Sequence, residues 1–136
     1  NITDISFFVP GTNTPATTSA FGAIFTDVEV PGLSRIEFFD ENNVSIYARD
    51  VLVSGNQGLS FSGAAAGAGE KIFRVRITSG LNTIVSNGIL GNPNDDVVVM
   101  DDFIYAEPAA VPEPATWTLL AGGAALLAFG RRRRRV

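Results

Sequence analysis

Short apolar runs separated by turn-forming residues occupy the chain up to about residue 106. The runs are rich in Val, Ile, Phe and Thr, and none sustains the period of about 3.6 residues that marks an amphipathic helix. Alternation with a period of two is clearest where Phe73, Val75 and Ile77 are interleaved with Arg74 and Arg76. The pattern predicts strands over residues 4–9, 21–30, 35–40, 45–53, 59–62, 71–78 and 97–105.

Turn chemistry separates these predicted strands, because Gly, Pro, Asn and Asp cluster between them. Short strands at this spacing predict an all-β fold with one β-sandwich domain over residues 1–106. The small residues of 64–69 predict a loop. Residues 107–111, which contain Pro108 and two alanines, predict a linker between this domain and the C-terminal tail.

The tail, residues 112–136, has a different pattern. Pro112, Glu113 and Pro114 are followed by the uncharged segment 115–130 and then by five arginines. Proline cannot continue a helix upstream, so the segment predicts a helix that begins at about residue 115. Such a helix spans about 24 Å, slightly less than the hydrocarbon core of about 30 Å. Trp117 and the arginines can anchor its two ends at the interfaces, which predicts one C-terminal transmembrane helix.

The terminal arginines predict the orientation of this helix. Basic residues beside a membrane helix stay in the cytoplasm, so residues 1–111 are expected on the far side of the membrane. A buried core helix needs a polar face, and a nucleic-acid-binding arm does not follow an apolar run, so both alternatives fit poorly. The residues that set this predicted topology are Trp117, Arg131, Arg132, Arg133, Arg134 and Arg135.

The run Val-Pro-Glu-Pro-Ala-Thr-Trp at 111–117, then Leu-Leu-Ala-Gly at 119–122 and the arginines, resembles a PEP-CTERM sorting signal. The resemblance implies a protein of a Gram-negative bacterium that is exported after a signal peptide. It implies retention in the inner membrane and processing by the transpeptidase exosortase near Pro112, Glu113 and Pro114. The mature protein is then expected at the cell surface or outside the cell, in a context often linked with exopolysaccharide.

Composition agrees with export and excludes several chemistries. The chain has no cysteine and no histidine, which rules out disulfides, thiolate sites and a serine–histidine triad. It begins at Asn1 without a basic and apolar leader, so we expect a fragment that lacks its natural N-terminus. Residues 1–111 hold five basic and thirteen acidic residues, and so a net charge of −8. This charge opposes binding to nucleic acid.

The predicted domain has a second resemblance. Ser-Arg-Ile-Glu-Phe-Phe-Asp at 34–40, Arg-Val-Arg-Ile-Thr at 74–78 and Val-Met-Asp-Asp-Phe at 99–103 are similar to core strands of bacterial jelly-roll modules. These are the galactose-binding-like and carbohydrate-binding-module-like domains. The resemblance implies a jelly-roll sandwich in which an aspartate pair on the closing strand lies near a structural calcium ion.

Two acidic pairs are candidate metal ligands. Asp101 and Asp102 lie within an apolar strand, where alternation sends one of them toward the core, at a cost unless it is paired. A calcium ion is one remedy, and an arginine or a backbone amide is another. Asp95 and Asp96 follow Asn-Pro-Asn at 92–94. Here a solvated turn is favoured over a calcium-binding loop.

Basic and aromatic residues raise two further alternatives. Arg74 and Arg76 lie on one strand face, and a solvent face paired with Glu37 or Asp27 is favoured over a sugar- or phosphate-binding patch. The aromatic residues can form a sugar-stacking platform, although most aromatics of a small β-domain belong to the core. These aromatic candidates are Phe7, Phe8, Phe38, Phe39 and Tyr47.

Three functions fit the sequence. The favoured one is a non-catalytic surface or matrix protein that binds exopolysaccharide or a surface protein and is processed through its tail. A protein that stays anchored in the membrane as a structural component is the second. The third is a small glycan-active enzyme that uses a carboxylate pair from Glu37, Asp40, Asp101 and Asp102, for which a sandwich of about 106 residues offers little room.

Overall fold

Antiparallel strands form all of the regular structure in the computed structural model, which describes residues 1–81 and 96–111. The strands, in chain order, are β1 (Ile2–Phe8), β2 (Pro15–Thr17), β3 (Ala20–Thr26), β4 (Arg35–Phe39), β5 (Ser45–Asp50), β6 (Leu59–Ala65), β7 (Arg74–Thr78), β8 (Val99–Tyr105) and β9 (Ala109–Ala110). The all-β prediction is therefore confirmed for the described residues.

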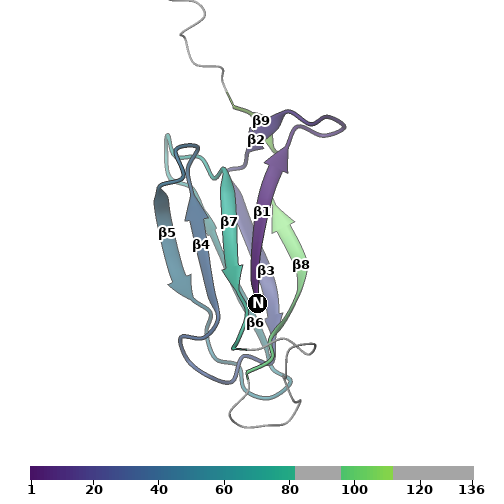
Figure 1. Cartoon of the computed structure of the whole chain (residues 1–136), viewed down its shortest axis with the longest axis vertical. Coiled ribbons are helices and arrows are strands. Elements are labelled where there is room, and N and C mark those ends of the chain that lie inside the picture. The colour runs from purple at the N-terminus through teal and green to yellow at the C-terminus, as the bar shows by residue number, and fades with distance from the viewer. Residues whose placement is uncertain (82–95, 112–136) are drawn as a thin grey trace, which may run out of the picture.

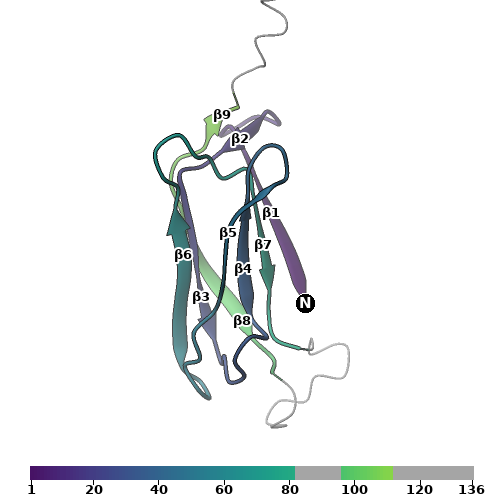
Figure 2. The same ribbon diagram turned by 90° about the vertical axis from the view of Figure 1, so that its left-hand side faces the viewer.

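The strands form two sheets that face each other (Figures 1 and 2). The larger sheet has the order β5-β4-β7-β1-β2-β9, and the smaller sheet has the order β6-β3-β8. Among the described strands, six of the eight steps between consecutive strands change sheet, and only β1–β2 and β4–β5 stay within one sheet. This arrangement fits the predicted β-sandwich. On one side of the sandwich, β5 of the larger sheet lies beside β6 of the smaller sheet. On the other side, β1 of the larger sheet lies beside β8 of the smaller sheet (Figures 1 and 2).

The core lies between the sheets and follows from strand alternation. Phe38 of β4 and Val75 of β7 point inward from the larger sheet, and Phe21 and Phe25 of β3 point inward from the smaller one. Burying each of these side chains contributes about 1.5–3 kcal/mol. Arg74 and Arg76 alternate with the buried positions of β7, as the sequence predicts.

The structure differs from the prediction where small residues form strands. β2 was not predicted, and β9 lies inside the stretch predicted as a linker. Ala16 pairs with both Phe7 and Ala110, so one short strand joins the chain's first strand to its last described segment. Ala64 and Ala65, predicted as part of a loop, continue β6 opposite β3. Cross-strand pairing supplies order that the intrinsic preference of alanine does not.

The predicted transmembrane helix, 115–130, and the residues that set its topology lie outside the described residues. In the part of the chain that the structure describes, no helix has the length and apolar character needed to cross a membrane.

Candidate functional site

The end of the sandwich that carries β9 leads directly into the tail. Ala109 and Ala110 pair with Thr17 and Ala16 of β2, and the Val111 amide donates to the Pro15 carbonyl at 3.4 Å. The chain is thus held to the larger sheet as far as Val111. The predicted motif residues Pro112, Glu113 and Pro114 follow immediately and lie outside the described residues.

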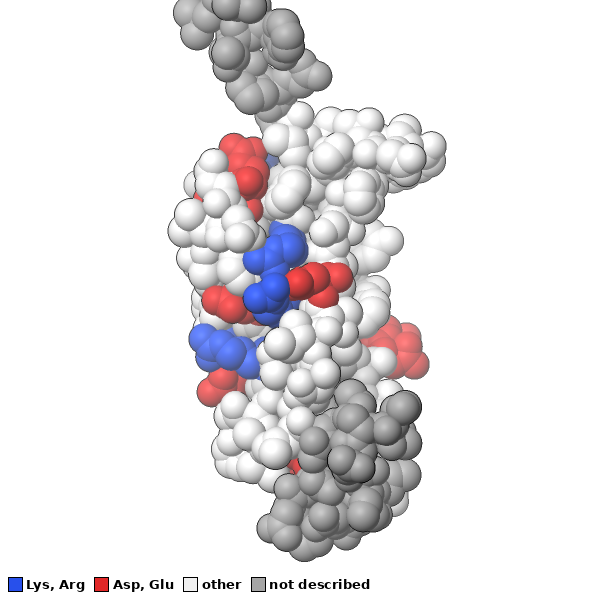
Figure 3. All heavy atoms as spheres, in the orientation of Figure 1, with Lys and Arg blue, Asp and Glu red and all other residues white. Residues whose placement is uncertain are grey.

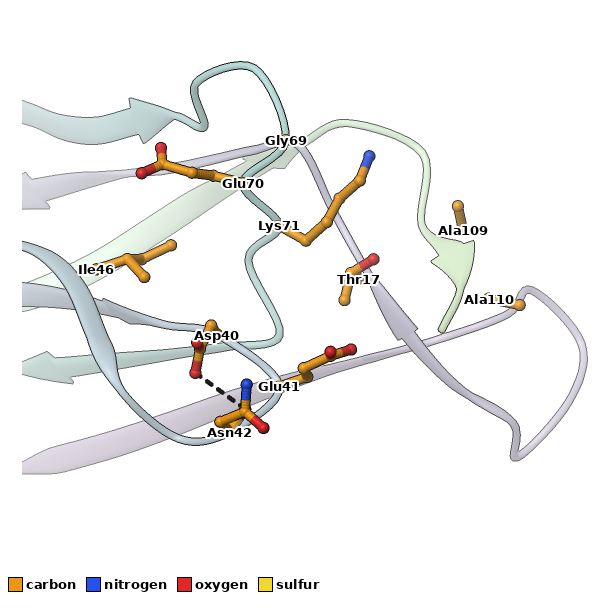
Figure 4. Close-up of a pocket in the computed structure, with 10 residues that line it drawn as sticks. All are labelled: Thr17, Asp40, Glu41, Asn42, Ile46, Gly69, Glu70, Lys71, Ala109 and Ala110. Carbon is orange, nitrogen blue, oxygen red and sulfur yellow. Dashed lines mark hydrogen bonds between the residues drawn. The ribbon is translucent and has the colours of Figure 1, made fainter. Parts of the chain in front are cut away.

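A cavity of about 550 Å³ lies at this end of the domain (Figure 4). Thr17 of β2 and the alanines of β9 line one part of it, and the β4–β5 turn and the β6–β7 connection line the rest. Its acidic side chains are Asp40, Glu41 and Glu70, and Lys71 supplies the opposite charge. In Figure 4 the Lys71 ammonium points away from Asp40 and Glu41.

Two of these carboxylates organise their own loops. Asp40 Oδ1 accepts hydrogen bonds from the Asn42 amide at 2.9 Å and the Val44 amide at 2.8 Å. Glu70 Oε2 accepts from the Gly67 amide at 2.9 Å. These hydrogen bonds account for the conformations of the β4–β5 turn and the β6–β7 connection without any ligand. The cavity is therefore a structured end of the domain, next to the start of the tail.

The charged face of the larger sheet is internally neutralised. Asp4 of β1 accepts hydrogen bonds from Arg76 Nε at 2.9 Å and Nη2 at 2.8 Å, and from Arg74 Nη1 at 2.7 Å. The hydrogen bonds from Arg76, followed by those from Arg74, lower the pKa of the Asp4 carboxyl to about 2. Figure 3 shows basic and acidic side chains side by side over this sheet. A free basic patch is absent from this described face.

The partners of these arginines differ in part from those predicted. Glu37 does lie opposite Arg76 across the sheet, but the carboxylate that binds both arginines belongs to Asp4. Asp27 is not involved, because its Oδ1 accepts the Gln57 amide at 2.8 Å in a turn at the far end of β3. Arg74 also stacks on a core-strand aromatic, with its guanidinium carbon 3.8 Å from the centre of the Phe39 ring.

A β-bulge in β8 overturns the expectation that Asp101 or Asp102 points into the core. Ile24 pairs with Asp101 and Gly22 pairs with Ile104, so Asp102 and Phe103 together lie opposite the single residue between Gly22 and Ile24. Asp102 has a φ of 50° and is exposed, as is Asp101. Regular alternation would bury the Asp102 side chain, and the bulge leaves it exposed. The physical argument for calcium at this pair is therefore lost.

The prediction that Asp96 lies in a solvated turn is also wrong, because the residue is buried. Only 1 % of its surface is exposed. Its Oδ1 accepts the Glu29 amide at 3.2 Å, and Oδ2 has no hydrogen-bond partner among the residues that the structure describes. Asp95 lies outside the described residues. Within residues 1–81 and 96–111 no three acidic side chains come together in a group that could hold a metal ion.

The aromatic candidates divide between core and surface. Phe7, Phe38 and Phe39 are buried, as the simpler interpretation predicts, whereas Phe8 and Tyr47 are exposed and lie in different parts of the larger sheet. The five residues therefore do not form one platform, and the favoured assignment to the core is confirmed for the three that are buried.

Sequence reasoning missed a different aromatic cluster, at the β1–β8 edge. There Phe103 and Tyr105 approach buried Phe21 and Phe7, with ring centres 5.9 and 6.0 Å apart. Their alternation was visible in the sequence, but the bulge that turns both rings inward was not.

The carboxylates named for glycosidase-type chemistry are spread over both sheets. Glu37 accepts the Ser45 hydroxyl at 2.7 Å, and Asp40 is held in the β4–β5 turn. Asp101 and Asp102 lie on β8 of the smaller sheet. The sequence-predicted candidates therefore do not converge on one site.

Comparison with known proteins identifies the tail. The PEP-CTERM protein-sorting motif matches residues 110–135. No curated protein and no solved structure matches the chain. The motif signifies an exported surface protein that is sorted and processed by exosortase. Its match begins at Ala110, which is still paired with β2, so the sorting signal starts on the edge of the folded domain.

Proposed function

We propose that this protein is a non-catalytic component of the cell surface or extracellular matrix, whose sandwich domain binds exopolysaccharide. The observation that carries the proposal is the overlap of the sorting motif with β9. The signal that sends the protein to the surface is joined directly to a folded domain. The domain is therefore the part that is delivered, and its own surface supplies the binding.

The described surface supports binding rather than catalysis. Arg74 and Arg76 of the larger sheet are neutralised by Asp4, and the carboxylates named above are divided between the two sheets. We place the domain in the jelly-roll class, because the chain changes from one facing sheet to the other at six of the eight steps between consecutive described strands. Such sandwiches serve in many proteins as rigid supports for binding edges and loops.

Before processing, we place the tail helix in the inner membrane with Trp117 at the outer interface and Arg131 to Arg135 in the cytoplasm. Three residues separate Val111 from the predicted helix start, and four residue steps of extended chain reach at most about 14 Å. The end of the domain with Asp40, Glu41 and Glu70 then faces the membrane. Its negative charge keeps it apart from anionic lipid.

A retention assay tests the proposal. The full chain, held in a polyoxyethylene detergent that contains no sugar, is passed over insoluble exopolysaccharide from the producing bacterium and over a dextran matrix as control. We expect retention on the exopolysaccharide alone. Absence of retention overturns the glycan proposal and favours a surface protein as partner.

The same assay with calcium and with a chelator tests the calcium prediction. Because no third acidic side chain among the described residues joins Asp101 and Asp102 in a group that could hold a metal ion, we expect retention to be equal in both. Loss of retention on chelation assigns a structural calcium ion instead.

A second candidate, permanent anchoring in the membrane, differs in one result. An anchored protein keeps its arginine tail in cells that contain exosortase. The presence of a sorting motif, which is a processing signal, favours processing over this alternative.

A further inference from the structure

We infer that the groove between β1 and β8 binds one neutral pyranose ring of the polymer. This inference rests on the proposed function and names the site that serves it. The groove has a volume of about 200 Å³. Sites for drug-sized ligands measure about 300–1,000 Å³, so this groove has room for a single sugar ring.

Aromatic rings line the groove on its floor and walls. Buried Phe7 and Phe21 form the floor, with ring centres 6.0 Å apart. Phe8, Phe103 and Tyr105 form the walls, and they are 48, 45 and 55 % exposed. The face of an aromatic ring is negative, and the axial C–H groups of a pyranose carry a small positive charge. Three half-exposed rings around one groove therefore offer faces for a sugar.

The β8 bulge is what aims two of these rings. Met100, before the bulge, pairs with Phe25 and packs against the core. Regular alternation would then point residues 102 and 104 inward. The extra residue at Asp102 shifts the alternation by one, so Phe103 and Tyr105 face the floor and Ile104 lies opposite Gly22 on the outer face. Bulges commonly re-aim side chains at binding sites.

The polar groups of the groove fit hydroxyls. β8 pairs with β3 and with no other strand in the described residues, so its other edge presents backbone amides and carbonyls beside the groove. Ser6 and Tyr105 add hydroxyl groups. No charged residue lines the groove among the residues that the structure describes, although residues 1–111 carry a net charge of −8. The groove therefore suits a neutral ligand with many hydroxyls, and poorly a charged one.

Matched variants test the site on the exopolysaccharide. Phe103→Ala and Tyr105→Ala remove two walls, and Phe61→Ala removes a ring of β6 that is 60 % exposed and not part of the groove. We expect each groove variant to weaken retention about ten-fold, and Phe61→Ala to leave it unchanged. Tyr105→Phe separates the ring from the hydroxyl and is expected to keep most of the binding. Circular dichroism checks that each variant is folded.

Further readouts test the groove separately from exopolysaccharide binding by the protein. Retention that is equal in wild type and groove variants overturns the groove and leaves exopolysaccharide binding intact. Independently of the polymer, saturation-transfer NMR with methyl β-glucoside, methyl β-galactoside and methyl α-mannoside is expected to show transfer to at least one sugar, lost in Phe103→Ala. No transfer to any of the three overturns the inference. Added salt is expected to have no effect, whereas salt-sensitive retention also contradicts a neutral site.

Discussion

Asp4 joins Arg76 through a two-pronged contact, in which Oδ1 accepts Nε at 2.9 Å and Oδ2 accepts Nη2 at 2.8 Å. The same Oδ1 also accepts Arg74 Nη1 at 2.7 Å. One carboxylate of β1 thus holds two arginines of the adjacent strand β7. The strand face that carries Arg74 and Arg76 looks basic in the sequence. In the structure Asp4 neutralises both arginines, so this face has a structural role.

The Asp4 contact predicts a pH-dependent contribution to stability. The pKa of Asp4 is lowered from 3.8 to about 2 in the folded protein, so its contribution is present above pH 3.8 and is lost as the pH falls through about 2. The carboxylate is 40 % exposed and partly screened, so Asp4→Asn should reduce the free energy of unfolding by only about 1 kcal/mol at pH 7. Urea unfolding of the chain at pH 7 and pH 2 measures this difference, which should fall to a small fraction of its pH 7 value at the lower pH.

Asp50→Asn is the matched control. Asp50 forms a single exposed ion pair with Arg35, so its loss should cost less than about 0.5 kcal/mol. Equal losses in the two variants at pH 7 would contradict the special role of Asp4.

Two glycines that face each other across β3 and β6 should respond differently to alanine. A Cβ at Gly63 would lie 2.7 Å from the backbone at Gly22 and Phe21, which cannot move without opening the sheet. A Cβ at Gly22 would meet the exposed Phe61 ring, which can swing away. Gly63→Ala should therefore destabilise by about 2–3 kcal/mol and Gly22→Ala by about 1 kcal/mol or less. Denaturant unfolding measures both, and the reverse order would show that the strand contact is wrong.

Asp102 should tolerate asparagine and reject valine. Its φ of 50° lies in the left-handed region, which Asn adopts readily and β-branched residues do not. Asp102→Val should cost about 1–2 kcal/mol of unfolding free energy, and Asp102→Asn almost nothing. Equal stability of the two variants would mean that β8 has no bulge at this position.

Pairing of β9 with β2 should slow processing of the tail. Thr17 lies opposite Ala109, and antiparallel partners have Cα atoms about 4.5–5.5 Å apart, within the range that a disulfide spans. Residues 1–136 contain no other cysteine, so within them Thr17→Cys combined with Ala109→Cys can form only this intramolecular bond. Because the motif begins at Ala110, we expect the locked protein to be cleaved more slowly than either single variant. Pulse–chase labelling in exosortase-containing cells measures the rate, and equal rates would show that β9 need not detach.

How far the fold followed from the sequence depends on local alternation. Val75 and Ile77 pointed inward and Arg74 and Arg76 outward, as their period of two predicts. Ala110 gave no such signal, because its strand exists only through pairing with Ala16.

The candidate site was harder to predict. One extra residue at Asp102 reverses the face on which every later residue of β8 lies. No local sequence pattern indicates that a bulge occurs there. Burial of Asp96 likewise depends on the approach of the segment at Glu29, which is distant in the chain. The tail was predictable because its recognition depends on contiguous residues, which the match to 110–135 confirms.

The mass of the mature protein shows most directly whether the sorting tail delivers the domain. The protein would be isolated from cells of the producing bacterium and from the same cells without exosortase, and its C-terminus determined by mass spectrometry. We predict that exosortase-containing cells yield a chain ending near Pro112, Glu113 and Pro114, and that cells without it retain Arg131 to Arg135. An intact arginine tail in both kinds of cell would show that exosortase does not process this protein.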